Sequence, residues 1–246
     1  DAVNDTWMTD SGRGLFKEFE SEDRLISYSV DQVAKSLDDA IAATRALLEA
    51  GSVGVIGSAH SSVEEQYLLQ KIVKQTGAIC EMVQHTGEGD NLLLSEDRTP
   101  NLRGALINGL INQLPEKELG QLKASIEEGS IKTLFVFNED LEQLGVDLGN
   151  LKESVQVIYF GSSRNTTSER AKVVFPSLSV FEKEGTFVNQ NFILQKFKQA
   201  IIPPIGLMSD CGVLKSILNE LNNEASENTT LSMDELWSEI SENVEI

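Results

Sequence analysis

Short apolar runs that alternate with helical segments constrain the fold of this chain more than any other feature. The first run, Val53-Gly54-Val55-Ile56-Gly57, is continuously apolar, which is typical of a strand that is buried on both faces of a sheet. Strands that alternate with helices form right-handed crossovers and a mostly parallel sheet. The predicted strands are residues 53–57, 79–84, 131–137, 155–160 and 172–175.

Three segments have the apolar period of an amphipathic helix. In the first of them, residues 30–50, apolar side chains recur from Val33 to Leu48, and Gly51 provides a stop. The other two helices are predicted at residues 63–75 and 116–128. Together with the strands, they predict a three-layer, Rossmann-like α/β domain with helices on both faces of a mostly parallel sheet.

The first stretch of the chain and a long internal segment depart from this alternation. Residues 1–28 are polar and irregular, apart from a short strand predicted at 25–28. We interpret the opening Asp-Ala-Val-Asn-Asp as a cut or processed end, and residues 1–28 as a linking remnant. Residues 85–115 are glycine-rich and carry no strong strand, so we expect a functional loop or the remnant of a larger region there.

The α/β domain is expected at residues 29–218, and an acidic tail with a short helix at 219–246. Ser232 and Glu235 have the S-x-x-E spacing of a capping box, which marks the start of that helix. Apolar side chains then recur on one face, which is expected to pack on the domain or, as the alternative, on a partner. This face consists of Met233, Leu236, Trp237 and Ile240.

The charge balance excludes several classes of partner. The 246 residues carry 39 acidic and 20 basic side chains, a formal net charge of −19 at pH 7. Nucleic acids and anionic lipid surfaces attract basic proteins, so neither is expected as a partner. No apolar run approaches the roughly 20 residues of a membrane-spanning helix, so no direct membrane insertion is expected. The acidity favours a solvated surface or docking against basic subunits.

Two strand-to-helix loops are candidate anion sites. Ser58 and Ser61 follow the first buried strand, and Ser162, Arg164 and Thr166 follow the fourth. Backbone N–H groups at a helix start can bind phosphate, and ligands of open α/β sheets bind at the carboxyl ends of the strands. Neither loop matches a dinucleotide-binding or Walker motif. Helix capping is therefore the preferred interpretation, and anion binding is the alternative.

Histidines and cysteines give no pattern of catalysis or metal binding. His60 lies among serines, but no G-x-S-x-G elbow surrounds it, so we expect an exposed loop residue, and the same for His85. Cys80 and Cys211 are interpreted as small buried apolar residues, with a reactive thiol at Cys211 as the alternative. These four residues match no zinc or iron–sulfur spacing, so no metal site is predicted.

The most specific motif follows the last predicted strand. That strand ends in Val173-Val174-Phe175-Pro176, and the run Glu182-Lys183-Glu184-Gly185-Thr186-Phe187-Val188-Asn189 comes after it. Spacing alone does not explain the charges beside the glycine. The run resembles the molybdopterin oxidoreductase superfamily, in which a strand ending in VVLP precedes EK-x-GT-x-x-N-x-EGR-x-Q. Two further segments resemble that family's NEE-x-Y and N-x-RGA motifs, namely Glu64-Glu65-Gln66-Tyr67 and Asn101-Leu102-Arg103-Gly104-Ala105.

An N-terminal motif narrows the resemblance. The run Trp7-Met8-Thr9-Asp10-Ser11-Gly12-Arg13 is similar to W-[MI]-C-D-x-G-R in the large peripheral-arm subunit of respiratory NADH–quinone oxidoreductase (complex I). The resemblance implies a shortened formate dehydrogenase/DMSO reductase-like fold. It also implies iron–sulfur clusters in a missing N-terminal half, and other peripheral-arm subunits as partners. The location implied is the cytoplasm, on the cytoplasmic face of the inner membrane.

Departures from the family pattern fall on the cofactor residues. Thr9 occupies the position of the fourth cluster-ligating cysteine, and a hydroxyl does not replace a thiolate on iron. Gln190-Asn191-Phe192 stands where pterin-binding members have EGR, and His60 stands where they have an arginine. The resemblance therefore implies a chain that has no cofactor and no catalytic residue of its own.

Three functions remain open at this point. The leading hypothesis is a cofactor-free, C-terminal scaffold portion of that large complex I subunit, which supports electron transfer from NADH to quinone by clusters elsewhere. The second is a fragment of a formate-dehydrogenase-like molybdoenzyme, which requires metal and pterin sites. The third is a free α/β domain that binds an anion or a nucleotide at one of the two serine-rich loops.

Overall fold

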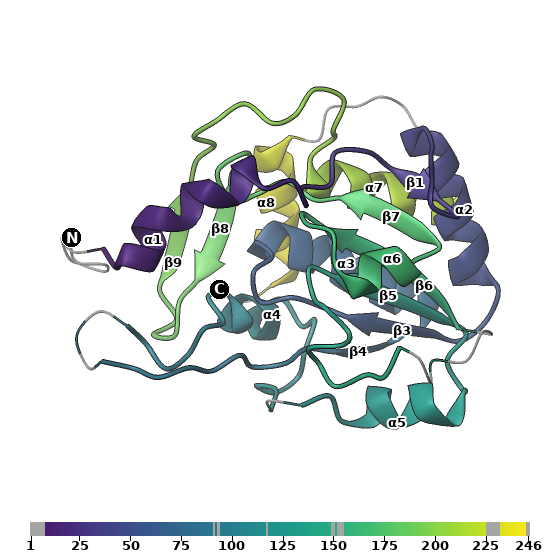
Figure 1. Ribbon diagram of the computed structural model, residues 1–246, viewed down its shortest axis with the longest axis horizontal. Helices are drawn as coiled ribbons and strands as arrows, with labels where there is room; N and C mark the ends of the chain where they lie inside the picture. The colour runs from purple at the N-terminus through teal and green to yellow at the C-terminus, as the bar shows by residue number, and fades with distance from the viewer. Residues whose placement is uncertain are drawn as a thin grey trace.

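A seven-stranded sheet forms the centre of the computed structural model (Figure 1). The structure describes residues 8–90, 92, 94–116, 118–148, 151, 155–224 and 232–244. The strand order is β2-β1-β7-β6-β5-β3-β4; the strands from β7 to β4 run parallel, and β1 and β2 are antiparallel. The strands are β1 (Ser29–Val30), β2 (Val33–Ala34), β3 (Val53–Ile56), β4 (Ile79–Glu81), β5 (Thr133–Phe137), β6 (Gln156–Gly161) and β7 (Val173–Pro176).

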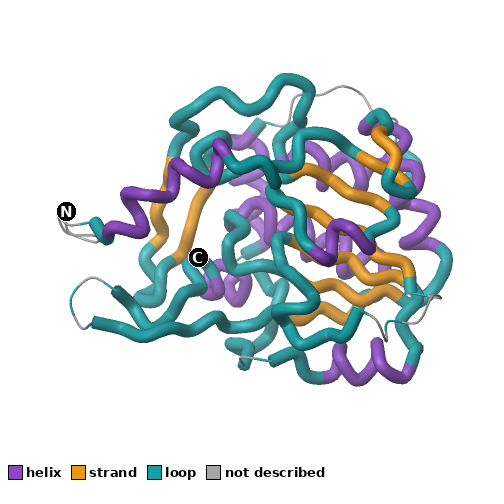
Figure 2. Tube along the Cα trace, viewed as in Figure 1, coloured by secondary structure: helices purple, strands orange, loops and turns teal. Residues whose placement is uncertain are grey.

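Helices and loops cover both faces of this sheet, which confirms the predicted three-layer α/β architecture (Figure 2). A separate antiparallel pair, β8 (Gly185–Val188) and β9 (Leu194–Phe197), forms a hairpin beside the sheet. The helices are α1 (Asp10–Gly14), the 3-10 helix η1 (Leu15–Glu20), α2 (Leu37–Glu49), α3 (Val63–Thr76), α4 (Leu102–Ile107), α5 (Gln121–Glu128), α6 (Thr166–Arg170), α7 (Asp210–Leu221) and α8 (Met233–Asn243).

Alternation of side chains along the buried strands divides the core into two parts. Phe135 and Phe137 of β5 lie in one core with apolar residues of α2, α3 and α7. Leu134 and Val136 point to the opposite face and share a second core with α5. On the first face, the rings of Phe137 and Phe160 stack with centroids 4.5 Å apart. Both faces of the central strands are thus covered, which explains their continuous apolar runs.

The predicted helix over residues 30–50 was wrong in its first turns. Residues Asp31 and Gln32 have positive φ angles of 51° and 62° and form the tight turn between β1 and β2. The helix α2 begins at Leu37, where the Ser36 hydroxyl accepts a hydrogen bond from the Asp39 N–H. The apolar period extended the prediction across a turn that neither glycine nor proline marks.

Other boundaries also shift. The strand predicted at 25–28 instead lies at Ser29–Val30, and the helix predicted at 116–128 begins at Gln121. The irregular N-terminal stretch contains α1 and η1, and residues 85–115 contain α4. Trp7, the first residue of the N-terminal motif, lies outside the described residues.

The acidic C-terminal helix packs on the domain, as predicted. Helix α8 begins after Ser232, whose hydroxyl accepts a hydrogen bond from the Glu235 N–H. Leu236 and Ile240 are buried in the same core as α3 and α7, and Met233 and Trp237 pack against that core. The apolar stripe of this helix is therefore satisfied within the chain.

Candidate functional site

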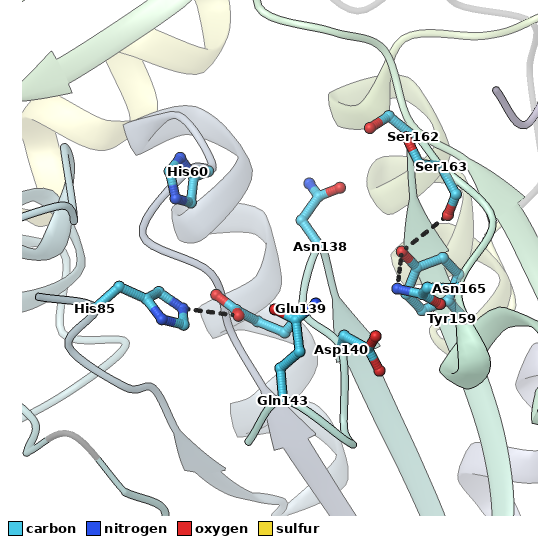
Figure 3. Close-up of a pocket in the computed structure, with 10 residues that line it drawn as sticks. All are labelled: His60, His85, Asn138, Glu139, Asp140, Gln143, Tyr159, Ser162, Ser163 and Asn165. Carbon is cyan, nitrogen blue, oxygen red and sulfur yellow. Dashed lines mark hydrogen bonds and ion pairs between the residues drawn. The ribbon is translucent and has the colours of Figure 1, made fainter. Parts of the chain in front are cut away.

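A polar cleft of about 370 Å³ lies at the carboxyl ends of β3, β5 and β6 (Figure 3). This is the sheet edge at which open α/β folds bind their ligands. A second cavity of about 440 Å³ shares His60, Asn138 and Ser162 with the cleft and has a more apolar wall. The ten residues that line the cleft are His60, His85, Asn138, Glu139, Asp140, Gln143, Tyr159, Ser162, Ser163 and Asn165.

The Glu139 carboxylate binds side chains of two different loops at this cleft, those of Ser58 and His85. Its Oε1 accepts a hydrogen bond from the Ser58 hydroxyl at 3.1 Å, and its Oε2 lies 2.9 Å from His85 Nε2 (Figure 3). The hydrogen bond to Glu139 raises the pKa of His85. The prediction of an exposed loop histidine is therefore wrong for His85, because the ring is partly covered and paired with a carboxylate 54 positions away.

His60 is exposed, as predicted, and it points into the cleft (Figure 3). The surrounding protein desolvates its ring, which lowers its pKa. Ser58, its neighbour, is fully buried and donates to a carboxylate rather than to an imidazole. The Ser61 hydroxyl is also buried and has no partner among the described residues. The serines and histidines near the cleft therefore do not form a nucleophile–base pair in the described part of the chain.

The second serine-rich loop is held by Asp140 and Tyr159. Asp140 Oδ1 accepts hydrogen bonds from the hydroxyls of Thr166 and Thr167 at 3.0 and 2.9 Å. The Tyr159 hydroxyl accepts a hydrogen bond from Asn165 Nδ2 at 3.0 Å, and burial raises the pKa of Tyr159 to about 12. These bonds fix the start of α6 beside the end of β5.

Asn138 forms the sharp bend between β5 and Glu139. Its φ of 51° lies in the left-handed region, which asparagine tolerates better than most residues. Its N–H donates to the Phe160 carbonyl at 2.6 Å, which anchors the bend to β6. The bend directs the Asn138 amide into the middle of the cleft, between His60 and Ser162 (Figure 3).

The candidate anion residues meet at this edge, but in acidic surroundings. Ser162 lines the cleft, whereas Arg164 is exposed and its N–H donates to the Asp23 carbonyl. Ser58 and Thr166 both donate to carboxylates. The molybdopterin cofactor of pterin-binding family members carries phosphate, whereas the described residues that line the cleft include two carboxylates and no lysine or arginine. These residues do not fit an anionic cofactor; anion binding by the loops stays a prediction.

Helix capping by these loops is observed. Ser62 and Asn165 are the N-cap residues of α3 and α6, and both form reciprocal capping boxes. The Ser62 hydroxyl accepts a hydrogen bond from the Glu65 N–H, while the Glu65 carboxylate accepts one from the Ser62 N–H. The preferred interpretation of the loops is thus confirmed for their capping role.

Lys183 and Glu65, from two of the family motifs, form a buried ionic cluster with Asp210. None of the three lines the polar cleft, but Lys183 also lines the adjoining cavity of about 440 Å³. Lys183 Nζ lies 2.6 Å from Glu65 Oε1 and 2.7 Å from Asp210 Oδ2, and all three side chains are buried. The two carboxylates raise the pKa of Lys183 above its ordinary value although burial opposes this. Burial raises the pKa of Glu65 to about 7. The cluster joins the N-termini of α3 and α7 to the segment that precedes β8.

A second carboxylate of the NEE-like motif, Glu64, extends this cluster into a network. Glu64 accepts hydrogen bonds from the Thr186 N–H and hydroxyl at 3.0 and 2.8 Å, and from the Trp237 indole at 2.7 Å. Gly185 is required nearby, because a Cβ there would lie 2.8 Å from the Ser62 Cβ. The glycine of the motif therefore allows the hairpin to approach the start of α3. We call the Glu64, Glu65, Lys183, Thr186 and Asp210 interactions the motif network.

The N-x-RGA segment joins the motif network through Asn101. Its Oδ1 accepts a hydrogen bond from the Val188 N–H at 2.7 Å, and its Nδ2 donates to the Ser61 carbonyl at 2.7 Å. Gln66 Nε2 donates to the Asn101 carbonyl at 3.1 Å. At Gly104, a Cβ would lie 2.3 Å from Asn101 Oδ1, so any larger residue at this position would clash with the Asn101 side chain. The motifs are visible in the sequence, but their contacts with one another are not.

Metal binding finds no support in the described part of the chain. No group of three His, Cys, Asp or Glu side chains in it could hold a metal ion. Cys80 is only half-buried, which corrects its predicted burial, and desolvation raises its pKa to about 12. Cys211 is buried as predicted, and burial raises the pKa of its thiol. Thr9 is the N-cap of α1, and its hydroxyl accepts the Gly12 N–H.

Comparison with known proteins identifies the family. A family model described as molybdopterin oxidoreductase matches residues 36–220, so this chain belongs to the molybdopterin oxidoreductase family. No significant match is found among curated proteins. Among the described residues, none of the helices is both long and apolar enough to cross a membrane.

The fold is also similar to a solved structure. A chain in the X-ray crystal structure of the formyltransferase/hydrolase complex from Methylorubrum extorquens, in complex with methylofuran, aligns with a TM-score of 0.52 and 12% identity. The alignment covers 80% of this chain and 99% of that chain. At this identity the similarity concerns the fold alone.

Proposed function

We propose that this chain is the cofactor-free scaffold portion of the large peripheral-arm subunit of a respiratory NADH–quinone oxidoreductase (complex I). Its role would be to hold neighbouring peripheral-arm subunits while iron–sulfur clusters in the N-terminal half of the large subunit carry electrons from NADH to quinone. The chain itself would perform no chemistry. The location that follows is the cytoplasmic face of the inner membrane.

The observation that carries this proposal is that the family-motif residues form contacts within the chain itself. The side chains of four motif residues bind other parts of the same chain, and none of them lines the polar cleft; they are Lys183, Glu64, Glu65 and Asn101. Lys183, which also borders the adjoining cavity, is already paired with Glu65 and Asp210. The cleft in turn presents carboxylates where an anionic cofactor would require cations. A fold whose motif residues bind other parts of the same chain, and whose cleft lacks cations for an anionic cofactor, is suited to a structural role.

Two further observations support the proposal. Thr9, in the place of a cluster cysteine, caps a helix through its hydroxyl, which is a use that needs no metal. The similar chain from Methylorubrum extorquens is part of a multi-subunit complex, and the alignment covers nearly all of it. A chain of little more than this fold can therefore be one component of an assembly.

Affinity purification from the native host tests the proposal. The whole protein that contains this chain would carry a tag and be purified under mild conditions. We expect NADH–quinone reductase activity to copurify, with peripheral-arm subunits present in equal amounts. Purification with formate-oxidising activity would instead support a molybdoenzyme, and tight nucleotide binding by a protein that purifies alone would support the free binding domain.

A further inference from the structure

One surface segment concentrates exposed apolar side chains. Seven of the thirteen large apolar side chains that are exposed among the described residues lie between positions 192 and 208. Figure 1 shows β9 and the loop that follows it along the left and upper edge of the molecule. We call these seven residues the apolar strip; they are Phe192, Ile193, Leu194, Ile201, Ile202, Ile205 and Met208.

The charge of this segment is opposite to that of the rest of the chain. Between Glu184 and Asp210 there is no acidic residue, and there are two basic ones, Lys196 and Lys198, both exposed. The whole chain has 39 acidic and 20 basic residues. Enrichment of large apolar side chains with depletion of acidic ones is typical of the centre of a protein–protein interface.

The loop between β9 and α7 is fixed to the domain at both ends. The N–H groups of Ala200 and Ile201 both donate to the Phe181 carbonyl, at 2.8 and 3.0 Å. At the other end, the Met208 N–H donates to the Tyr28 hydroxyl at 2.9 Å. The loop is therefore anchored on both sides of its most exposed residues.

The middle of the loop is stiffened while its side chains face solvent. Pro203 and Pro204 restrict the backbone between Ile202 and Ile205. These two isoleucines are 87% and 102% exposed. Burial of a fully exposed isoleucine favours association, and a loop that is fixed before binding loses little conformational entropy.

We propose that the apolar strip is the docking surface for a neighbouring protein subunit. The partner surface would be apolar, with carboxylates at its rim that face Lys196 and Lys198. The identity of that partner as a complex I subunit rests on the proposed function, whereas the docking itself does not. A membrane is a poorer occupant because anionic headgroups repel a chain of charge −19. A second copy that docks through the same segment would offer Lys196 and Lys198 no carboxylate, because the segment between Glu184 and Asp210 contains no acidic residue.

Site-specific photo-crosslinking in the native host tests this inference on the full protein. The crosslinking variants are Ile202→p-benzoylphenylalanine and Ile205→p-benzoylphenylalanine. The matched controls are Ile26→p-benzoylphenylalanine and Val33→p-benzoylphenylalanine, at apolar positions that are 63% and 58% exposed outside the strip. We expect both strip variants to crosslink to the same protein, identified by mass spectrometry, and both controls to give at least tenfold less of that product.

A second variant measures assembly and separates the two proposals. Ile202→Ser combined with Ile205→Ser is expected to lower the assembled fraction of the protein at least tenfold, whereas Ile26→Ser with Val33→Ser leaves it unchanged. Crosslinks to one identified protein outside complex I, with the same loss of assembly, would support the docking surface and contradict the proposed function. Crosslinks to lipid, crosslinked dimers of this chain, equal products at the controls, or unchanged assembly would each overturn the docking surface.

Discussion

The motif network and the strand-end cleft are two polar regions of one fold, and they differ in how their charges are satisfied. In the network, Lys183 is buried between two carboxylates, and its neighbours are hydrogen-bonded. In the cleft, the His85–Glu139 pair is partly open to solvent, and the backbone bends sharply at Asn138. In this chain the residues that mark the family are therefore used for internal packing, whereas the cleft at the strand ends is lined by residues outside the motif network.

The largest effect is expected from breaking the motif network at its buried lysine. Lys183→Met leaves Glu65 and Asp210 buried without their partner, which costs about 3–5 kcal/mol of unfolding free energy. Urea unfolding measures the loss. Lys172→Met is the matched control, because Lys172 pairs with Asp31 at 3.7 Å on the surface, where such pairs contribute less than about 1 kcal/mol. Equal stability of the two variants would show that the buried ion pairs of Lys183 do not stabilise the fold.

A pH series should show the next largest effect. The pKa of Glu65 is raised from 4.5 to about 7 in the folded chain, so the folded state holds a proton that the unfolded state releases. The contribution of this bound proton to stability is therefore fully present below about pH 4.5 and is lost as the pH rises through about 7; it is on the order of 3 kcal/mol. Glu65→Gln should remove this pH dependence in urea unfolding; a dependence that persists unchanged would contradict the assignment.

A glycine substitution tests the close approach of the hairpin to α3. In Gly185→Ala, the new Cβ would lie 2.8 Å from the Ser62 Cβ and 2.9 Å from the Phe197 ring. Relief of this overlap moves the hairpin and costs about 1–3 kcal/mol. Gly14→Ala is the control, since no described neighbour lies within 4 Å of its Cβ position. Thermal unfolding at the same pH compares them, and a Gly185→Ala chain as stable as the control would rule out tight packing there.

The smallest effect is expected in the cleft. His85→Ala removes a pair whose histidine is partly exposed, so the loss should be under about 1 kcal/mol at pH 6. The pKa of His85 is raised by Glu139, so this contribution is present below about 6.5 and falls as the pH rises through the folded value. Urea unfolding at pH 6 and pH 8 measures it. A loss as large as that of Lys183→Met would erase the contrast between the two regions.

Much of the fold could be predicted from local patterns in the sequence. The continuously apolar runs correctly predicted the parallel strands β3, β5 and β6, since each is covered on both faces. The capping-box spacing at Ser232 correctly marked the start of α8. The start of α2 was missed because Asp31 and Gln32 adopt positive φ without a glycine to indicate the turn.

The polar regions depend on contacts that local patterns do not encode. Lys183 meets Glu65 across 118 positions, and His85 meets Glu139 across 54. The charges beside Gly185 could be recognised in the sequence as a family motif, but their partners appear only when α3, the hairpin and α7 are brought together. Neither His85 nor Glu139 lies in a quoted family motif, so no signal in the sequence indicated that these two side chains would pair in the cleft.

The metal and pterin content of the purified protein shows whether its family motifs still hold a cofactor. The chain from Asp1 to Ile246 would be produced in cells supplied with molybdenum, tungsten and iron, and analysed by elemental mass spectrometry and pterin fluorescence. If the family motifs serve only packing in this chain, all three metals and the pterin should stay at the level of a metal-free control protein. Molybdenum or tungsten bound with pterin in proportion to protein, and lost on mutation of Asn138 or His60, would contradict it.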